Sequence, residues 1–80
     1  MNVICEKPYQ YLLVESEGEY FLTFFTGGPV EIDICVRLTD SEIKEVDENN
    51  SNVEKLVKLF KNNRSSFEGR RVIPSVLPEN

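Results

Sequence analysis

Apolar and polar residues alternate most regularly between Val30 and Leu38. The apolar positions are Val30, Ile32, Ile34, Val36 and Leu38, and the intervening residues are Glu31, Asp33, Cys35 and Arg37. Successive side chains of a strand point to opposite faces, so a period of two indicates a β-strand. The pattern predicts a strand with one buried face and one solvated, charged face.

The preceding segment, Tyr20 to Thr26, is apolar on both alternating sets. These sets are Tyr20, Leu22 and Phe24 on one side, and Phe21, Thr23 and Phe25 on the other. Such a pattern is typical of a central strand, or of a strand whose second face is covered. Thr26-Gly27-Gly28-Pro29 joins it to the next strand, and Gly-Gly supplies the positive φ values of a hairpin turn. Because a strand follows, and not a helix, the glycines are interpreted as a turn and not as a phosphate loop.

Upstream, Tyr9 to Glu15 is predicted to form another strand, which the reversal Glu17-Gly18-Glu19 joins to the next. Val3 to Cys5 can add a short edge strand, separated by Pro8. The first half of the chain therefore predicts an antiparallel meander of three or four strands.

After Leu38 the period changes to that of helices. Thr39-Asp40-Ser41-Glu42 has the form of a capping box, with Leu38 and Ile43 as a hydrophobic staple, and this helix ends at Asn49-Asn50. Ser51-Asn52-Val53-Glu54 has the same form. It opens a second helix that ends near Asn62-Asn63, with the apolar stripe Val53, Leu56, Val57 and Phe60.

The remaining chain predicts little regular structure. Arg70 to Ile73 can form one more short strand, Pro74 and Pro78 prevent further regular structure, and residues 75–80 are expected to form a frayed tail. The predicted fold is a single α+β domain over residues 1–80: a three- to four-stranded antiparallel meander, then two helices packed on one face. The pattern leaves open which face the helices cover.

Length and composition set further bounds. Eighty residues are too few for a second core. No apolar run is long enough to span a bilayer, and the N-terminus MNVICEKPYQ lacks the features of a signal peptide. A cytoplasmic protein is therefore expected.

The two cysteines, Cys5 and Cys35, fit no disulfide framework, and without histidine they cannot complete a zinc site within one chain. Two reduced, half-buried thiols are expected in the cytoplasm. A disulfide stays geometrically open if the strands carrying them are neighbours.

Catalytic and metal-binding patterns are weak. Without histidine the commonest general base is missing. Ser41-x-x-Lys44 matches SxxK but lacks its partner motifs. Asp47-x-Asn49-x-Ser51 opens like a calcium loop, yet its twelfth position is Lys58 where a glutamate belongs. We expect no enzyme activity, no catalytic residue, no metal and no cofactor.

Charge is distributed unevenly along the chain. Residues 1–50 hold eleven acids and three bases, a balance of −8, whereas residues 51–80 hold three acids and six bases, a balance of +3. Two such segments can simply face each other within one domain.

The acids in the first half also suggest a surface for a basic partner. The candidate partner-binding residues are Phe21, Phe25, Glu31, Asp33 and Arg37. If the two phenylalanines share a side with Glu31 and Asp33, they form an apolar patch rimmed by acids. If the second helix covers that side, they belong to the core.

The chain from Tyr11 to Arg71 resembles a group of short bacterial proteins of no assigned activity. These share a strand with a Gly-rich turn, a strand running into "LT-acid-x-E-I", an amphipathic helix and a terminal basic-aliphatic piece. The matching residues are Gly27, Gly28, Val36, Arg37, Leu38, Thr39, Glu42, Ile43, Leu56 and Arg71. In size, acidity and lack of catalytic groups the chain is also similar to bacterial immunity proteins.

The leading hypothesis is a non-enzymatic protein–protein interaction module, either an inhibitor or immunity-like protein or an accessory subunit. It would bind a basic partner through an acidic, aromatic-flanked sheet face. One alternative is a structural homodimer that buries the doubly apolar strand. Another is a nucleic-acid binder that uses the basic residues of the C-terminal third, Lys55, Lys58, Lys61, Arg64, Arg70 and Arg71.

Overall fold

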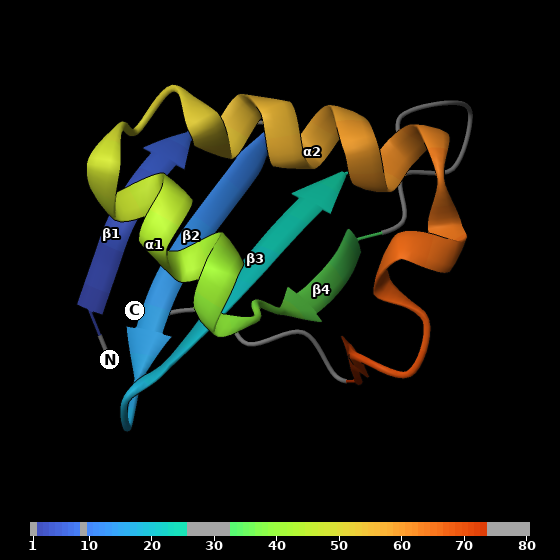
Figure 1. Cartoon of the computed structure of the whole chain (residues 1–80), viewed down its shortest axis with the longest axis horizontal. Helices are drawn as coiled ribbons and strands as arrows, with labels where there is room; N and C mark the ends of the chain where they lie inside the picture. Colours follow the sequence, from blue (N-terminus) through green and yellow to red (C-terminus); the bar gives the residue numbers. More distant parts are fainter. Residues whose placement is uncertain (1, 9, 26–32, 74–80) are drawn as a thin grey trace.

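The computed structural model of the chain describes residues 2–8, 10–25 and 33–73. Their strands pair antiparallel in chain order, β1-β2-β3-β4-β5, and the helices α1 and α2 lie on one face of this sheet (Figure 1). The elements are β1 (Asn2–Lys7), β2 (Tyr11–Ser16), β3 (Glu19–Phe25), β4 (Asp33–Arg37), α1 (Asp40–Glu48), α2 (Asn52–Asn62), the 3-10 helix η1 (Arg64–Phe67) and β5 (Arg71–Val72).

This arrangement confirms the predicted α+β fold, including the short C-terminal strand. The predicted Gly27-Gly28 turn and the predicted tail at residues 75–80 lie outside the described residues. No helix of the described residues is long and apolar enough to cross a membrane.

A two-residue turn connects β2 and β3, as predicted. Ser16 pairs with Glu19, and the residues between them, Glu17 and Gly18, have φ values of 54° and 81°. Two successive positive φ values match the twist of a hairpin. This turn fixes the register that sends Leu13, Leu22 and Phe24 to the face under the helices, which we call the helix face.

The main core fills the space between the helix face and α2. The predicted stripe of α2, Val53, Leu56, Val57 and Phe60, is buried there. Phe24, Phe60 and Phe67 form an aromatic cluster, with the rings of Phe60 and Phe67 edge to face at 5.5 Å between centroids. Aromatic pairs at such separations add stabilisation beyond their buried area.

The opposite side of the sheet, which we call the second face, is also apolar. Its side chains Leu12, Val14, Phe21 and Cys35 form a separate buried cluster, with Val72 against it. Thr23 lies on the same face; it is fully buried, and its Oγ1 has no hydrogen-bond partner among the described residues. β3 is thus buried on both sides, in agreement with its doubly apolar pattern.

The first predicted capping box is confirmed. The Glu42 amide donates to Thr39 Oγ1 at 3.3 Å, and the Thr39 amide donates to the Glu42 carboxylate at 2.9 Å. Leu38, just before the cap, is buried, and Ile43 packs against the same core. Local sequence alone sets this helix start.

The second predicted capping box is wrong. Ser51 has helical backbone angles and makes no side-chain cap hydrogen bond. Asn49 accepts from the Ser51 amide through Oδ1, and the Asn52 side-chain amide donates to the Glu45 carbonyl at 2.8 Å. The turn between the helices is too tight for Ser51 to adopt the extended angles that a capping side chain requires.

The two cysteines lie far apart in the sheet. Cys5 is in β1 and Cys35 in β4, with β2 and β3 between them, and both thiols are free. Cys5 packs on the helix face, whereas Cys35 is buried in the second face. Three strand spacings put about 14 Å between them, too far for a bond. The disulfide that the sequence left open does not form within the chain.

Candidate functional site

The register of the sheet brings most of the predicted partner-binding residues onto one side. Phe21 is paired with Arg37, and Phe25 with Asp33. All four alternate with residues of the helix face, so they lie on the second face. Glu31 lies outside the described residues.

Burial divides this predicted surface into a closed centre and an open rim. Phe21 is 9% exposed, and the neighbouring Thr23 and Cys35 are fully buried, so the Phe21 ring is not available at the surface. Asp33 and Arg37 are exposed at the rim, and Arg37 pairs with Glu19 at 3.5 Å. The predicted apolar patch rimmed by acids is therefore reduced to Phe25, which is half-buried, and this charged rim.

A more open acidic surface lies at the end of the sheet near α1. There the ring of Tyr20 stands between two carboxylates, Glu15 on β2 and Asp47 on α1. Tyr20 is paired with Glu15 across the strands, and its hydroxyl donates a long hydrogen bond of 3.5 Å to Asp47 Oδ1. Glu17 and Glu48 are exposed on the adjoining turn and helix. We call Glu15, Glu17, Tyr20, Asp47 and Glu48 the acidic end.

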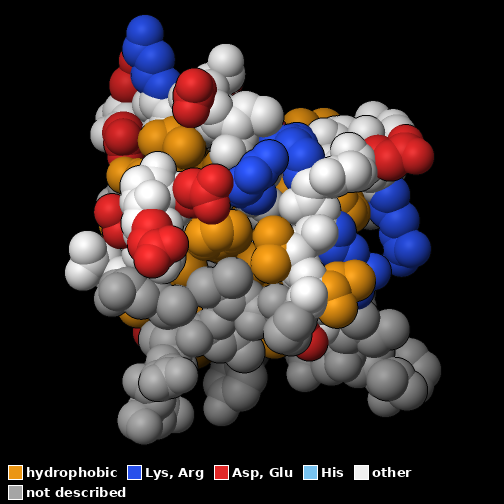
Figure 2. All heavy atoms as spheres, turned by 90° about the horizontal axis from the view of Figure 1, so that it is seen from below, with side chains coloured by type: hydrophobic (Ala, Val, Ile, Leu, Met, Phe, Trp, Pro, Cys, Tyr) orange, Lys and Arg blue, Asp and Glu red, His pale blue; other side chains and the backbone are white. Residues whose placement is uncertain are grey.

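The electrostatics of Tyr20 report this concentration of negative charge. Burial raises the pKa of Tyr20, and the charges of Asp47 and Glu15 raise it further. The phenol stays protonated at neutral pH and presents an O–H donor beside the carboxylates. Seen from below, Figure 2 shows most of the visible acidic side chains on the left and most Lys and Arg side chains in the centre and on the right.

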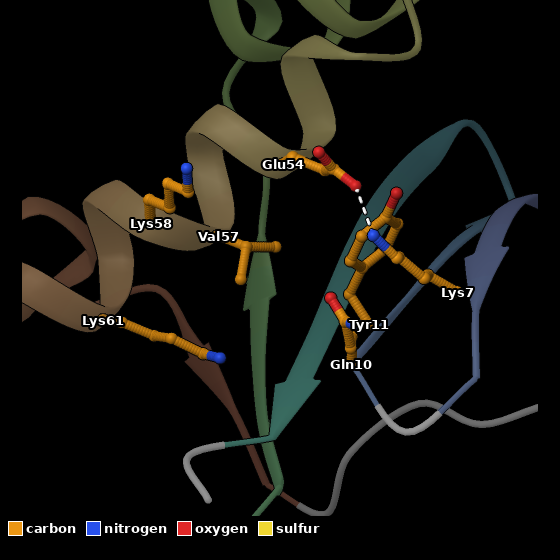
Figure 3. Close-up of a pocket in the computed structure, with 7 residues that line it drawn as sticks. All are labelled: Lys7, Gln10, Tyr11, Glu54, Val57, Lys58 and Lys61. Carbon is orange, nitrogen blue, oxygen red and sulfur yellow. Dashed lines mark hydrogen bonds and ion pairs between the residues drawn. The ribbon is translucent and has the colours of Figure 1, made fainter.

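A basic cleft of about 310 Å³ lies between α2 and the connection of β1 to β2 (Figure 3). The side chains that line it are Lys7, Gln10, Tyr11, Glu54, Val57, Lys58 and Lys61. Lys7 and Glu54 bridge the cleft with an ion pair of 2.9 Å. Lys61 extends from α2 toward the sheet side without an ion pair among the described residues (Figure 3). We call this the lysine cleft.

The charges in the lysine cleft are unequal. The hydrogen bond from Lys7 lowers the pKa of Glu54, as do the positive charges of Lys7 and Lys58. Burial raises the pKa of Tyr11, and Cys5 and Glu54 raise it further. At neutral pH the cleft thus holds one carboxylate, a protonated phenol and three ammonium groups, a net charge of +2.

Sequence reasoning found only part of this cleft. Lys58 and Lys61 were recognisable as bases on the outer side of a helix, the ordinary solvated position. Lys7, Gln10 and Tyr11 carried no signal, because they lie over 40 residues from α2 and meet it only through the sheet topology. The long-range pair of Lys7 with Glu54 cannot be deduced from either segment alone.

Among residues 2–8, 10–25 and 33–73 no group of three or more acidic or cysteine side chains is placed to hold a metal ion. Comparisons with protein-family models, with curated proteins and with solved structures gave no match. The resemblances noted in the sequence therefore stay predictions, and the function has to be inferred from the two charged surfaces.

Proposed function

We propose that this protein is a non-enzymatic protein–protein interaction module that binds a basic partner through the acidic end. The observation that carries the proposal is the placement of Glu15 and Asp47, from different elements, on either side of Tyr20. Their inhibitor-like or immunity-like use, or a role as an accessory subunit, is part of the proposal.

The acidic end is suited to binding because its charges are not neutralised within the chain. The ion pairs of the described residues involve Glu19, Glu42 and Glu54. None of the four carboxylates of the acidic end takes part in them. Unpaired surface carboxylates steer a basic partner and fix its orientation.

Tyr20 supplies the apolar component that charge alone lacks. Its ring packs against the main core while its hydroxyl reaches Asp47, so the side chain is held in place. Tyrosine is enriched among residues that dominate binding energy, because it buries a large ring with little loss of conformational freedom. This is the acidic, aromatic-flanked character expected from the sequence, at a different part of the sheet.

Two other hypotheses lose their motivation. The homodimer was predicted to bury the doubly apolar β3, but both sides of β3 are buried within one chain. The nucleic-acid binder needs a continuous basic stripe, yet Arg70 is bound to Glu42, and Lys55 and Lys61 line hollows on different sides of α2.

The proposal is tested by capturing partners from the native host on the immobilised protein. Glu15→Lys/Asp47→Lys should lose the partner that the wild-type protein recovers at low salt. Glu68→Lys, which reverses an exposed acid away from the acidic end, is the control and should keep it. Equal recovery by wild-type protein and the double variant would contradict the proposal.

A further inference from the structure

We propose that the lysine cleft is a second binding site, one that takes a small organic anion with an apolar body and a phosphate or paired carboxylates. The site is separate from the acidic end and opposite in charge. It goes beyond the proposed function, and either can fail without the other.

The size and shape of the cleft set the class of ligand. About 310 Å³ lies at the lower end of the volumes of small-molecule sites. Its walls come from α2 on one side and from the connection of β1 to β2 on the other, held at a fixed separation by the shared core (Figure 3). A site built between a helix and a sheet is preformed, so little ordering is needed when a ligand binds.

The lining chemistry sets the charge and the apolar part. Val57 and Tyr11 are 6% and 7% exposed, and they form a floor on which an apolar body can rest. Lys61 is free of ion pairs among the described residues and points across the cleft, so it can donate to an anion without first breaking a contact (Figure 3). Gln10 adds a neutral amide at the sheet side. An ammonium beside an apolar floor is matched by an amphipathic anion.

Glu54 acts against the ligand, which makes a sharp prediction. Its carboxylate occupies Lys7 at 2.9 Å and brings a negative charge to the rim. Glu54→Gln removes this charge and releases Lys7 toward the cleft. The variant should therefore bind the anion more tightly than the wild-type protein does.

The test is a titration of ¹⁵N-labelled full-length protein with phenyl phosphate and, separately, with phthalate, followed by amide chemical shifts. Saturable shifts centred on Gln10, Tyr11 and residues 54–61 are expected, with a dissociation constant of about 1 mM or tighter. Tighter binding of phenyl phosphate indicates a phosphate ligand, and tighter binding of phthalate a dicarboxylate. Inorganic phosphate alone should bind more weakly than either.

Three variants decide whether the cleft itself is responsible. Lys61→Gln should weaken binding roughly three- to tenfold, and Glu54→Gln should strengthen it roughly threefold. Lys55→Gln removes the same charge from another side of α2 and should leave the affinity unchanged. The proposal is overturned if neither organic anion gives saturable shifts, if inorganic phosphate binds equally well, or if Lys55→Gln and Lys61→Gln have the same effect.

Discussion

Arg70 grips Glu42 with both ends of its guanidinium, at 2.6 Å to Oε1 and 3.3 Å to Oε2. The same guanidinium donates to the carbonyls of Arg37 and Ser66 and lies 5.9 Å from the centre of the Phe60 ring. Glu42 also accepts from the Thr39 amide. The pair thus ties the start of α1, the end of β4 and η1 together in one hydrogen-bonded unit.

Arg70→Ala should lower the free energy of unfolding by roughly 2–4 kcal/mol, because it leaves a largely buried carboxylate and two carbonyls without their donor. The side chains of Arg70 and Glu42 are only 19% and 15% exposed. The adjacent, exposed Arg71 is the matched control, and Arg71→Ala should change stability by less than about 0.5 kcal/mol. Urea denaturation measures both, and equal losses would refute a special role for Arg70.

The two helix starts give a second matched pair. Thr39→Ala should cost about 1 kcal/mol, because Thr39 caps α1 through its side chain. Ser51→Ala should cost less than about 0.5 kcal/mol, because Ser51 caps nothing. The measurement is again urea denaturation of both variants. A larger loss for Ser51→Ala would restore the capping box that the sequence predicts there.

Tyr20 should titrate above the usual tyrosine range, because burial and the nearby charges of Asp47 and Glu15 disfavour the phenolate. The folded state then prefers the protonated phenol. Its stabilising contribution is complete below the unfolded pKa of about 10 and is lost as the pH rises through the folded pKa.

Spectrophotometric titration of the tyrosines measures this, with Tyr20→Phe assigning the signal. Asp47→Asn should lower the Tyr20 pKa toward its ordinary value, whereas Asp40→Asn, on the first turn of α1, should not. An unchanged Tyr20 titration in Asp47→Asn would show that the carboxylate does not act on the ring.

The thiols should react as two free groups with different rates. Cys5 is partly exposed in β1, whereas Cys35 is fully buried. Ellman's reagent should therefore modify Cys35 at least roughly tenfold more slowly than Cys5 in the native protein, since Cys35 is reached only when the sheet opens. Cys5→Ser assigns the slow phase. Two equal rates, or no free thiol after purification under oxidising conditions, would contradict the arrangement of strands.

Local patterns were sufficient for most elements of this fold. The alternation in β4, the doubly apolar β3 and the stripe of α2 each specify their own burial, and Thr39 with Glu42 sets a helix start within four residues. Ser51 shows the limit of a local signature, because Asn49 and Asn52 satisfy the same backbone groups in another way.

The long-range relationships could not be predicted. Because β3 is apolar on both sides, its sequence gives no sign of which side α1 and α2 cover, so Phe21 could not be assigned to the interior. The acidic end joins β2, β3 and α1, and the Arg70–Glu42 pair spans 28 residues. Both depend on the register and topology of the sheet, which no single segment encodes.

The most direct test of the acidic end is the affinity of the captured partner, measured by calorimetry at several salt concentrations. The wild-type protein should bind with an affinity that falls as salt rises, and Glu15→Lys/Asp47→Lys should bind at least roughly tenfold more weakly at low salt. Glu68→Lys should bind as the wild-type protein does. The same affinity and the same salt dependence in the double variant would mean that the partner binds elsewhere.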